Sequence, residues 1–176
     1  MVYKGTTIYF EKGARIQINN GVFVLGRRVG VPWGSALRML ENSSLVINGN
    51  AFIEYGADIV LNKNSVMYVN DNLYLNCRAT IRCYKTIKIG RDVLIGNDLD
   101  MRDGDGHILN GVLKNKEVVI EDHVWVGHNV RILKGVTLYK DCFIGAGSLV
   151  TKNVPEKCMA LGYPAEVVKK DIVWER

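Results

Sequence analysis

The sequence predicts an all-β fold of the parallel β-helix type, because hydrophobic residues return every six positions between residues 120 and 154. Eleven of the twelve core positions of this stretch are hydrophobic, and only Ser148 is not. A period of six fits neither a strand, which repeats every two residues, nor a helix, which repeats every 3.6. It fits a coil of short flat faces with a corner after each face, three faces closing one triangular turn. The core positions are Ile120, Val124, Val126, Val130, Ile132, Val136, Leu138, Cys142, Ile144, Ser148, Val150 and Val154.

The same period runs less regularly through the preceding part of the chain. A change of register near residues 62–72 predicts extra residues at one corner, and the stretch 30–40 is irregular. Before it, alternating hydrophobic residues around the turn Asn19-Asn20-Gly21 predict early strands. A fully regular solenoid of this length would stack about nine or ten coils, so one β-helix domain over residues 1–176 suffices. The earlier core positions are Ile47, Ile53 and Ile59, then Cys77, Cys83, Ile89, Ile95 and Met101.

Composition excludes several classes of function. The 23 Lys and Arg against 18 Asp and Glu give a net charge of +5, which favours a small anionic ligand, but no dense basic run suggests nucleic acid. The start of the chain lacks a signal-peptide pattern, and no apolar run approaches the ~20 residues of a membrane span. We therefore expect a cytoplasmic protein without membrane insertion. Cys77, Cys83 and Cys142 occupy repeat positions and are expected in the core, and the cysteines show neither a disulfide framework nor zinc spacing.

The repeat is interrupted by an insertion at about residues 102–117, rich in Gly, Asp and Asn. It carries His107, with Asp103 and Asp105 just before it. Functional residues gather on loops that project from rigid scaffolds. An imidazole can take a proton from a hydroxyl at neutral pH, and a carboxylate can hold its tautomer. A solvated polar loop is the alternative interpretation, and a Ca²⁺ site is disfavoured because the later ligands of the usual loop are missing.

Three motifs after the insertion resemble a known family. They are residues 124–136 (VWVGHNVRILKGV), 144–155 (IGAGSLVTKNVP) and 162–165 (GYPA). In this order they are similar to the hexapeptide-repeat acyltransferases with a left-handed parallel β-helix, and within these to the sugar and polysaccharide O-acetyltransferases. The resemblance covers about residues 101–170. It implies left-handed coiling, a short C-terminal extension, acetyl-CoA as acyl donor without a required metal, a sugar or glycan precursor as acceptor, and a homotrimer with active sites between subunits.

The resemblance also implies roles for individual residues. The family's catalytic base is a histidine on the loop before the Trp motif, which is His107 here. Either Asp105 or Asp103 would orient it, and Asp105 is the residue we select. Trp125 matches a tryptophan near the reacting groups, although a subunit contact would also explain an exposed corner Trp. The residues expected along acetyl-CoA are Gly145, Ala146 and Gly147 for the pantetheine arm, and Thr151, Lys152 and Lys169 or Lys170 for the phosphates. Tight corners and solvated lysines are the alternative interpretations of this set.

Several alternatives stay open. An N-acyltransferase acting on a nucleotide-linked amino sugar is the enzymatic alternative, and a purely structural β-solenoid is the non-enzymatic one. Serine, maltose and galactoside acetyltransferases have helical N-terminal parts, whereas the first fifty residues here alternate like strands. The γ-class carbonic anhydrases are disfavoured because Leu133 stands where their second zinc-binding His would be, and His123 and His128 are spaced in another phase. His128 departs from the family's small or hydroxyl residue, and either lines the acceptor site or faces a neighbour.

Overall fold

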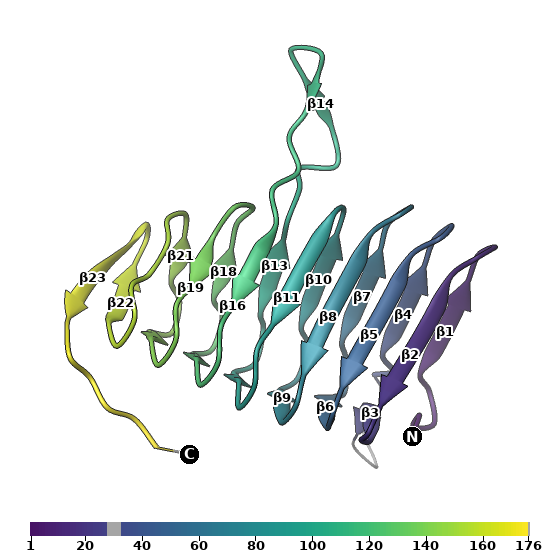
Figure 1. Cartoon of the computed structure of the whole chain (residues 1–176), viewed down its shortest axis with the longest axis horizontal. Helices are drawn as coiled ribbons and strands as arrows, with labels where there is room; N and C mark the ends of the chain where they lie inside the picture. Colours follow the sequence, from purple (N-terminus) through teal and green to yellow (C-terminus); the bar gives the residue numbers. More distant parts are fainter. Residues whose placement is uncertain (28–32, 176) are drawn as a thin grey trace.

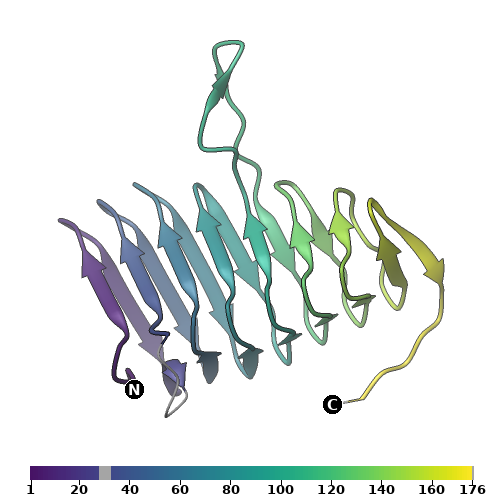
Figure 2. The ribbon, with the colours of Figure 1, turned by 180° about the vertical axis from the view of Figure 1, so that it is seen from behind.

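The computed structural model describes residues 1–27 and 33–175. Within them the chain consists of strands and turns, and no helix there is long and apolar enough to cross a membrane. Successive strands wind around a triangular prism (Figure 1). As the chain advances from right to left in Figure 1, it descends the near face, and Figure 2 shows that it ascends the opposite face, which makes the coil left-handed. The predicted left-handed parallel β-helix is confirmed.

Three parallel sheets form the faces of the prism. They are numbered in the order in which the chain first enters them. The first sheet has the order β1 (Thr7–Phe10), β4 (Ala36–Met39), β7 (Asp58–Leu61), β10 (Thr80–Cys83), β13 (Asp100–Arg102), β18 (Arg131–Ile132) and β21 (Leu149–Val150). The second sheet has the order β2 (Arg15–Asn19), β5 (Ser44–Asn48), β8 (Val66–Asn70), β11 (Thr86–Ile89), β16 (Val118–Ile120) and β19 (Thr137–Leu138).

The third sheet closes the prism and forms its lower face in Figure 1. Its strands are β3 (Phe23–Arg27), β6 (Ala51–Glu54), β9 (Leu73–Leu75), β12 (Leu94–Ile95), β17 (Trp125–Val126), β20 (Phe143–Ile144), β22 (Met159–Gly162) and β23 (Ala165–Lys169). Strand β23 pairs antiparallel with β22 and ends the stack. This hairpin and the tail after it form the predicted C-terminal extension.

The inward positions of the repeat form one continuous core. All twelve positions predicted between Ile120 and Val154 are buried, as are the earlier ones. Ser148, the one polar member, donates to the Gly145 carbonyl (2.6 Å) and accepts from the Gly162 N–H (3.2 Å). The three cysteines predicted in the core are buried. A polar side chain is therefore tolerated in this core because both of its hydrogen-bonding functions are satisfied.

The early coils are longer than a strict hexapeptide repeat. Ala36 pairs with Asp58 and Asp58 with Thr80, a step of 22 residues, whereas Arg131 pairs with Leu149, a step of 18. The first sheet consequently has seven strands, so the nine or ten coils of a fully regular solenoid do not form. The corner between β7 and β8 holds four residues and that between β10 and β11 holds two, which agrees with the predicted change of register.

The stretch 30–40, predicted to be irregular, contains a regular strand in its second half. β4 buries alternate side chains, those of Leu37 and Met39, as a strand of the first sheet must. Residues 30–32 of that stretch lie outside the described residues. An alternation of inward and outward side chains over only four positions is too short to be recognised in the sequence beside the six-residue period.

The predicted insertion projects from the prism between β13 and β16 (Figure 1). Its tip is a small antiparallel hairpin of β14 (Ile108–Leu109) and β15 (Val112–Leu113). The loop leaves the prism at the corner between the first and second sheets, because β13 belongs to the first and β16 to the second.

Candidate active site

Asp103 fixes the root of the projecting loop. Its carboxylate is fully buried and accepts hydrogen bonds from the backbone N–H groups of Tyr84 (2.5 Å), Lys85 (2.8 Å) and Thr86 (2.5 Å). Burial, and next the charge of Asp103, raise the pKa of the neighbouring Cys83 thiol to about 12. A buried carboxylate that accepts three N–H bonds belongs to the framework of the corner. The structure therefore gives Asp103 an anchoring position beneath the loop.

Two glycines pack the loop against the ring of Tyr84. A Cβ on Gly104 would come within 2.9 Å of the ring, and one on Gly106 within 2.6 Å of the phenol oxygen. Gly106 also has a φ of 73°, which disfavours other residues. The segment just before His107 is thus held in place at its root.

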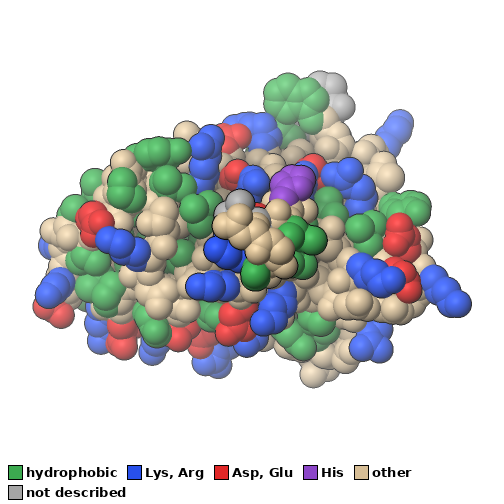
Figure 3. Space-filling view, turned by 90° about the horizontal axis from the view of Figure 1, so that it is seen from above, with side chains coloured by type: hydrophobic (Ala, Val, Ile, Leu, Met, Phe, Trp, Pro, Cys, Tyr) green, Lys and Arg blue, Asp and Glu red, His purple; other side chains and the backbone are tan. Residues whose placement is uncertain are grey.

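His107 is exposed beyond this anchored segment, and no hydrogen bond joins it to another described residue. The carboxylate of Asp105, predicted to orient it, is instead paired with the ammonium of Lys134. Figure 3 looks down on this face and shows one histidine surrounded by side chains of both charges. Within one protomer the His107 imidazole is therefore solvent-exposed, and Asp105, its predicted partner, forms an ion pair with Lys134 instead.

A groove of about 270 Å³ lies on the outside of the repeat coils, at the corner between the third and first sheets. Trp125 faces outward in it and stacks on Phe143 of the next coil, with ring centroids 4.3 Å apart. The remaining lining side chains and backbone belong to Asn76, Leu94, Gly96, Gly127, His128 and Ala146. The groove therefore combines an aromatic wall with a floor of small residues.

The glycines beside the groove are demanded by coil stacking. A Cβ on Gly96 would come within 2.8 Å of the backbone of Gly127, and one on Gly127 within 2.7 Å of the backbone of Ala146. On Gly145 it would meet the Leu161 side chain at 2.8 Å. The tight-corner interpretation is therefore confirmed for Gly145, and Gly127 on the preceding coil meets the same constraint. Because these glycines have no side chains, the outer surface of the corners is also recessed. The absence of side chains therefore explains both the close packing of the coils and the open groove.

The other residues predicted along acetyl-CoA extend from this groove toward the C-terminal end. Ala146 lines the groove itself, and Gly147 lines a smaller hollow of about 120 Å³. Gly147 has a φ of 74°, and a Cβ added to it would have no heavy atom within 4 Å, so the space above it is open. Lys152 is exposed and pairs with Glu166 at 3.2 Å. Thr151, Lys169 and Lys170 are also exposed.

His128, whose role the sequence left open, lines the same groove as Trp125. Its Nδ1 accepts the backbone N–H of Asn97 at 2.9 Å. His123, by contrast, lies before β17, where its Nδ1 is 2.8 Å from Asp141 and its ring stacks on Trp174 at 4.1 Å. The two histidines therefore stand at opposite ends of β17. Among the described residues no group of three or more His, Cys, Asp or Glu is arranged to hold a metal ion.

Trp174 packs against the prism from the C-terminal extension. The residue is 9% exposed, and its ring lies 5.9 Å from that of Trp125, centroid to centroid. The backbone N–H of Ile172 donates to the Lys157 carbonyl at 3.0 Å and holds the tail near this point. The tail thus covers one side of the Trp125 ring and leaves its other side to the groove.

A second, polar hollow of about 320 Å³ continues the groove toward the N-terminal coils and shares Asn76 with it. Tyr74 donates from its hydroxyl to the 8% exposed Glu54 (2.8 Å), and Arg27 lies 3.9 Å from the same carboxylate. Burial and this hydrogen bond raise the pKa of Tyr74. Cys77 completes the lining. The sequence analysis did not predict this hollow. The usable signal was that polar residues occur at equivalent positions near the ends of successive third-sheet strands.

One protomer does not bring His107 and the Trp125 groove together. The loop leaves at the corner between the first and second sheets, whereas the groove lies on the third sheet and its corner with the first. In Figure 1 the loop projects from the top and the third sheet lies along the bottom. The two halves of the predicted site therefore occupy different corners of the prism.

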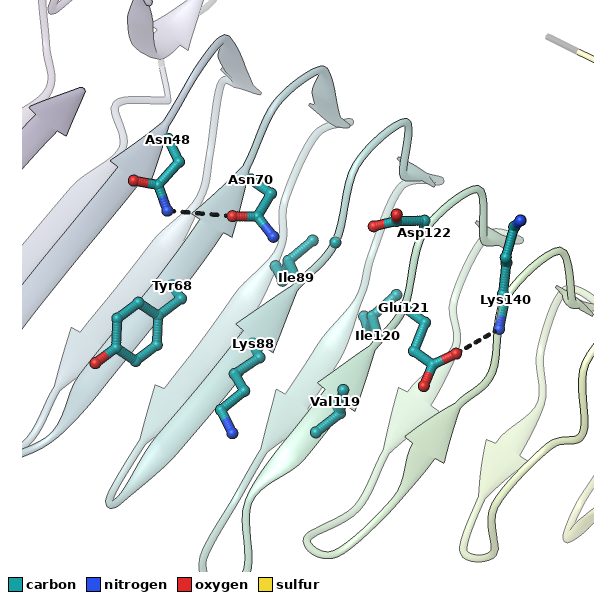
Figure 4. A pocket seen from close by; sticks show the side chains of 11 residues that line it. Asn48, Tyr68, Asn70, Lys88, Ile89, Val119, Ile120, Glu121, Asp122 and Lys140 are labelled. Atoms are coloured by element: carbon teal, nitrogen blue, oxygen red, sulfur yellow. Dashed lines mark hydrogen bonds between the residues drawn. The ribbon is translucent and has the colours of Figure 1, made fainter. Parts of the chain in front are cut away.

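Another hollow, of about 520 Å³, lies on the outer face of the second sheet (Figure 4). Tyr68, Lys88 and Val119 project from its strands, and Asn48 donates to Asn70 (3.2 Å) along one edge. It contains neither the loop nor the groove residues.

Comparisons with known proteins agree with this architecture. A family model described as bacterial transferase hexapeptide (six repeats) matches residues 117–152. A polysialic acid O-acetyltransferase of Escherichia coli O1:K1 / APEC is 35% identical over 85 residues, covering 45% of this chain and 28% of that protein. A galactoside O-acetyltransferase of Lactococcus lactis subsp. lactis is 48% identical over 60 residues, covering 34% of this chain and 29% of that protein. The chain thus spans less than a third of the curated relatives it matches.

Solved structures share the fold over nearly the whole chain. The polySia-specific acetyltransferase NeuO has a TM-score of 0.68 at 24% identity, covering 99% of this chain and 90% of that one. A galactoside acetyltransferase in complex with coenzyme A has a TM-score of 0.51 at 24% identity, covering 91% of this chain and 66% of that one. The predicted resemblance to the hexapeptide-repeat acyltransferases is confirmed, and the repeat itself matches from residue 117 onward.

Proposed function

We propose that this chain, whose coils carry the hexapeptide repeat of the bacterial transferases, is an O-acetyltransferase that moves an acetyl group from acetyl-CoA to a hydroxyl of a sugar or glycan precursor. The observation that supports it best is the exposed His107 imidazole on a loop anchored by Asp103. The matched relatives named as polysialic acid and galactoside O-acetyltransferases agree with a sugar hydroxyl as acceptor. With acetyl-CoA as donor, the expected compartment stays the cytoplasm.

His107 would act as general base. Its Nε2 or Nδ1 takes the proton of the acceptor hydroxyl while the oxygen attacks the thioester carbonyl. The carbonyl π electrons move to oxygen, and the oxyanion is stabilised by N–H donors. When the tetrahedral species collapses, the C–S bond breaks and the imidazolium returns its proton to the sulfur of CoA. An acyl-cysteine route through Cys83 or Cys142 is disfavoured because both thiols lie in the core, where burial raises their pKa to about 12.

The groove supports a placement for the donor. Its floor at Ala146 and the open space above Gly147 suit a narrow pantetheine arm. Exposed cations beyond it, at Lys152, Lys169 and Lys170, would meet the CoA phosphates. The acetyl end then points the other way, toward Asn76 and the polar hollow. Carboxylate, phenol and guanidinium groups converge there, as in sites that recognise sugar hydroxyls.

A homotrimer would complete the site. The outer face of the third sheet carries a ladder of outward apolar side chains in register, which single protomers leave half-exposed. Packing this ladder into the hollow of the second sheet of the next copy (Figure 4) forms a closed ring of three. The loop corner of one copy then meets the groove corner of another, so His107 reaches Trp125 across the interface. The ladder consists of Phe52, Tyr74, Leu94, Trp125, Phe143 and Met159.

The catalytic part of the proposal is tested with His107→Ala and a panel of acceptors. Thiol release from acetyl-CoA should need a sugar or glycan hydroxyl, and kcat should fall by about 10² to 10⁴ in the variant. Calorimetric affinity for CoA should stay the same, because the loop base does not hold the donor. A variant that keeps more than about a tenth of the wild-type kcat with its true acceptor contradicts the assignment. Preference for an amino sugar, with little dependence on His107, would favour the N-acyltransferase alternative.

The composite site is tested by mixing two inactive variants. His107→Ala keeps a sound groove, and Ala146→Trp keeps a sound loop. After random reassembly of trimers, about a quarter of the interfaces combine the two intact halves, so about a quarter of wild-type activity should return. Light scattering should give three times the 19.7 kDa chain mass. A fully active monomer, or mixtures that stay inactive although subunits exchange, would contradict this part of the proposal.

A further inference from the structure

His128 is held in one tautomer at the edge of the Trp125 groove. Its Nδ1 lies 2.9 Å from the backbone nitrogen of Asn97 and accepts that N–H. A nitrogen that accepts a hydrogen bond carries no proton, so in the neutral ring the proton is on Nε2. The backbone carbonyl of His128 accepts the Gly147 N–H (2.8 Å), which fixes the residue from the other side. The imidazole therefore offers a single N–H donor from a positioned ring.

The surroundings of this donor match a place where a carbonyl oxygen would sit. The side chain is exposed and lines the groove together with Trp125, Phe143 and Ala146. The other lining residues are apolar or small, so the N–H-bearing side chains of the groove are His128, Asn76 and the indole of Trp125. A fixed N–H donor beside an apolar wall stabilises a developing negative charge better than mobile water does.

We propose that His128 Nε2–H donates a hydrogen bond to the thioester carbonyl oxygen of the acyl donor. This hydrogen bond becomes stronger as that oxygen turns into an oxyanion. This inference rests on the proposed acetyltransferase function. No proton is transferred: when the acceptor oxygen bonds to the carbonyl carbon, the π electron pair moves to the carbonyl oxygen, and Nε2 keeps its hydrogen. His128 is then a catalytic residue on the groove side of the site, as His107 is on the loop side.

The chain allows a matched pair of variants. In His128→Asn the amide oxygen can replace Nδ1 as the acceptor for the Asn97 N–H, but the variant has no donor at the Nε2 position. In His128→Gln the longer side chain places an amide N–H near that position. We expect His128→Asn to lower kcat by about 10² to 10³, the usual loss for one oxyanion donor, and His128→Gln to recover at least about tenfold of it. Both should leave the calorimetric Kd for CoA, which lacks the acyl carbonyl, within about twofold.

The measurements are thiol release for kcat and calorimetry with free CoA, on variants whose Tm and mass match the wild type. An unchanged kcat in His128→Asn, beside an inactive His107→Ala, overturns the role of His128 alone. Weaker CoA binding with unchanged kcat also overturns it, since His128 would then hold the pantetheine arm. A wild type that releases no thiol with any acceptor overturns the proposed function and this inference together. Should His128→Asn unfold, His128→Gln and His128→Ala give the same comparison.

Discussion

Replacing Asp103 with Asn should destabilise the protein strongly. Oδ1 of the buried carboxylate accepts the N–H of Tyr84, while Oδ2 accepts those of Lys85 and Thr86. An amide has only one oxygen, so its NH₂ group must face at least one of these donors and leave it unsatisfied. The lost charged hydrogen bond contributes about 1.5 to 3 kcal/mol, and a buried unsatisfied donor costs about 1 to 3 kcal/mol. Allowing for overlap, we expect the free energy of unfolding to fall by about 3 kcal/mol.

Asp105→Asn is the matched control, two residues later on the same loop. The Asp105 side chain is 44% exposed, and its ion pair with Lys134 is of a kind that contributes at most about 1 kcal/mol. Both variants are compared by urea unfolding, followed by Trp fluorescence at one protein concentration, because the stability of an oligomer depends on concentration. Equal losses in the two variants, or less than about 1 kcal/mol for Asp103→Asn, would refute the anchoring role.

The remaining predictions concern the groove and acid stability. Gly127→Ala should cost about 1 to 3 kcal/mol in urea unfolding, because its Cβ would stand 2.7 Å from the backbone nitrogen of Ala146; an unchanged midpoint would contradict this packing. Ala146→Trp should fill the groove and abolish CoA binding in calorimetry, and a folded trimeric variant that binds CoA normally would place the donor elsewhere. The hydrogen bond from Arg78 lowers the pKa of Asp98 below its ordinary 3.8, so the stability it contributes is present above that pH and is lost as the pH falls toward the folded-state value. Asp98→Asn should therefore weaken the pH dependence of unfolding below about pH 4 and nowhere else.

The C-terminal coils could be predicted residue by residue, whereas the N-terminal coils could not. From β17 to β21 each face uses a two-residue strand and a corner of four residues, so the period of six survives in the sequence. Between β4 and β11 the strands have three to five residues and the corners two to four, so one turn there takes up to 22 residues. The inward positions then fall out of phase with any fixed period. Strand β4 was missed for this reason, although its side chains alternate as in any strand.

Part of the candidate site could be proposed from the sequence. The insertion with His107 and the small residue Ala146 stand out in the sequence, and the structure shows an exposed loop and an open groove there. Glu54 and Tyr74 did not stand out, because they lie on successive turns and only the register of the coils brings them together. The difference between Asp103 and Asp105 was also hidden. It depends on three N–H donors at the corner before β11, and these are far away in the sequence.

A parallel β-helix keeps every residue on its own corner. Successive coils stack in register, so equivalent side chains on successive turns are displaced along the axis but stay on the same face or corner of the prism. A base on the corner between the first and second sheets therefore cannot reach a groove beside the third sheet, however the loop is lengthened by a few residues. Two solutions remain, a very long loop or a second copy of the chain, and the half-exposed ladder through Trp125 and Phe143 favours the second copy. In that arrangement the aromatic wall of the groove is also part of the subunit contact, so assembly and donor binding depend on the same side chains. Loss of the trimer and loss of activity would then occur together, because a separated protomer holds only half of each site.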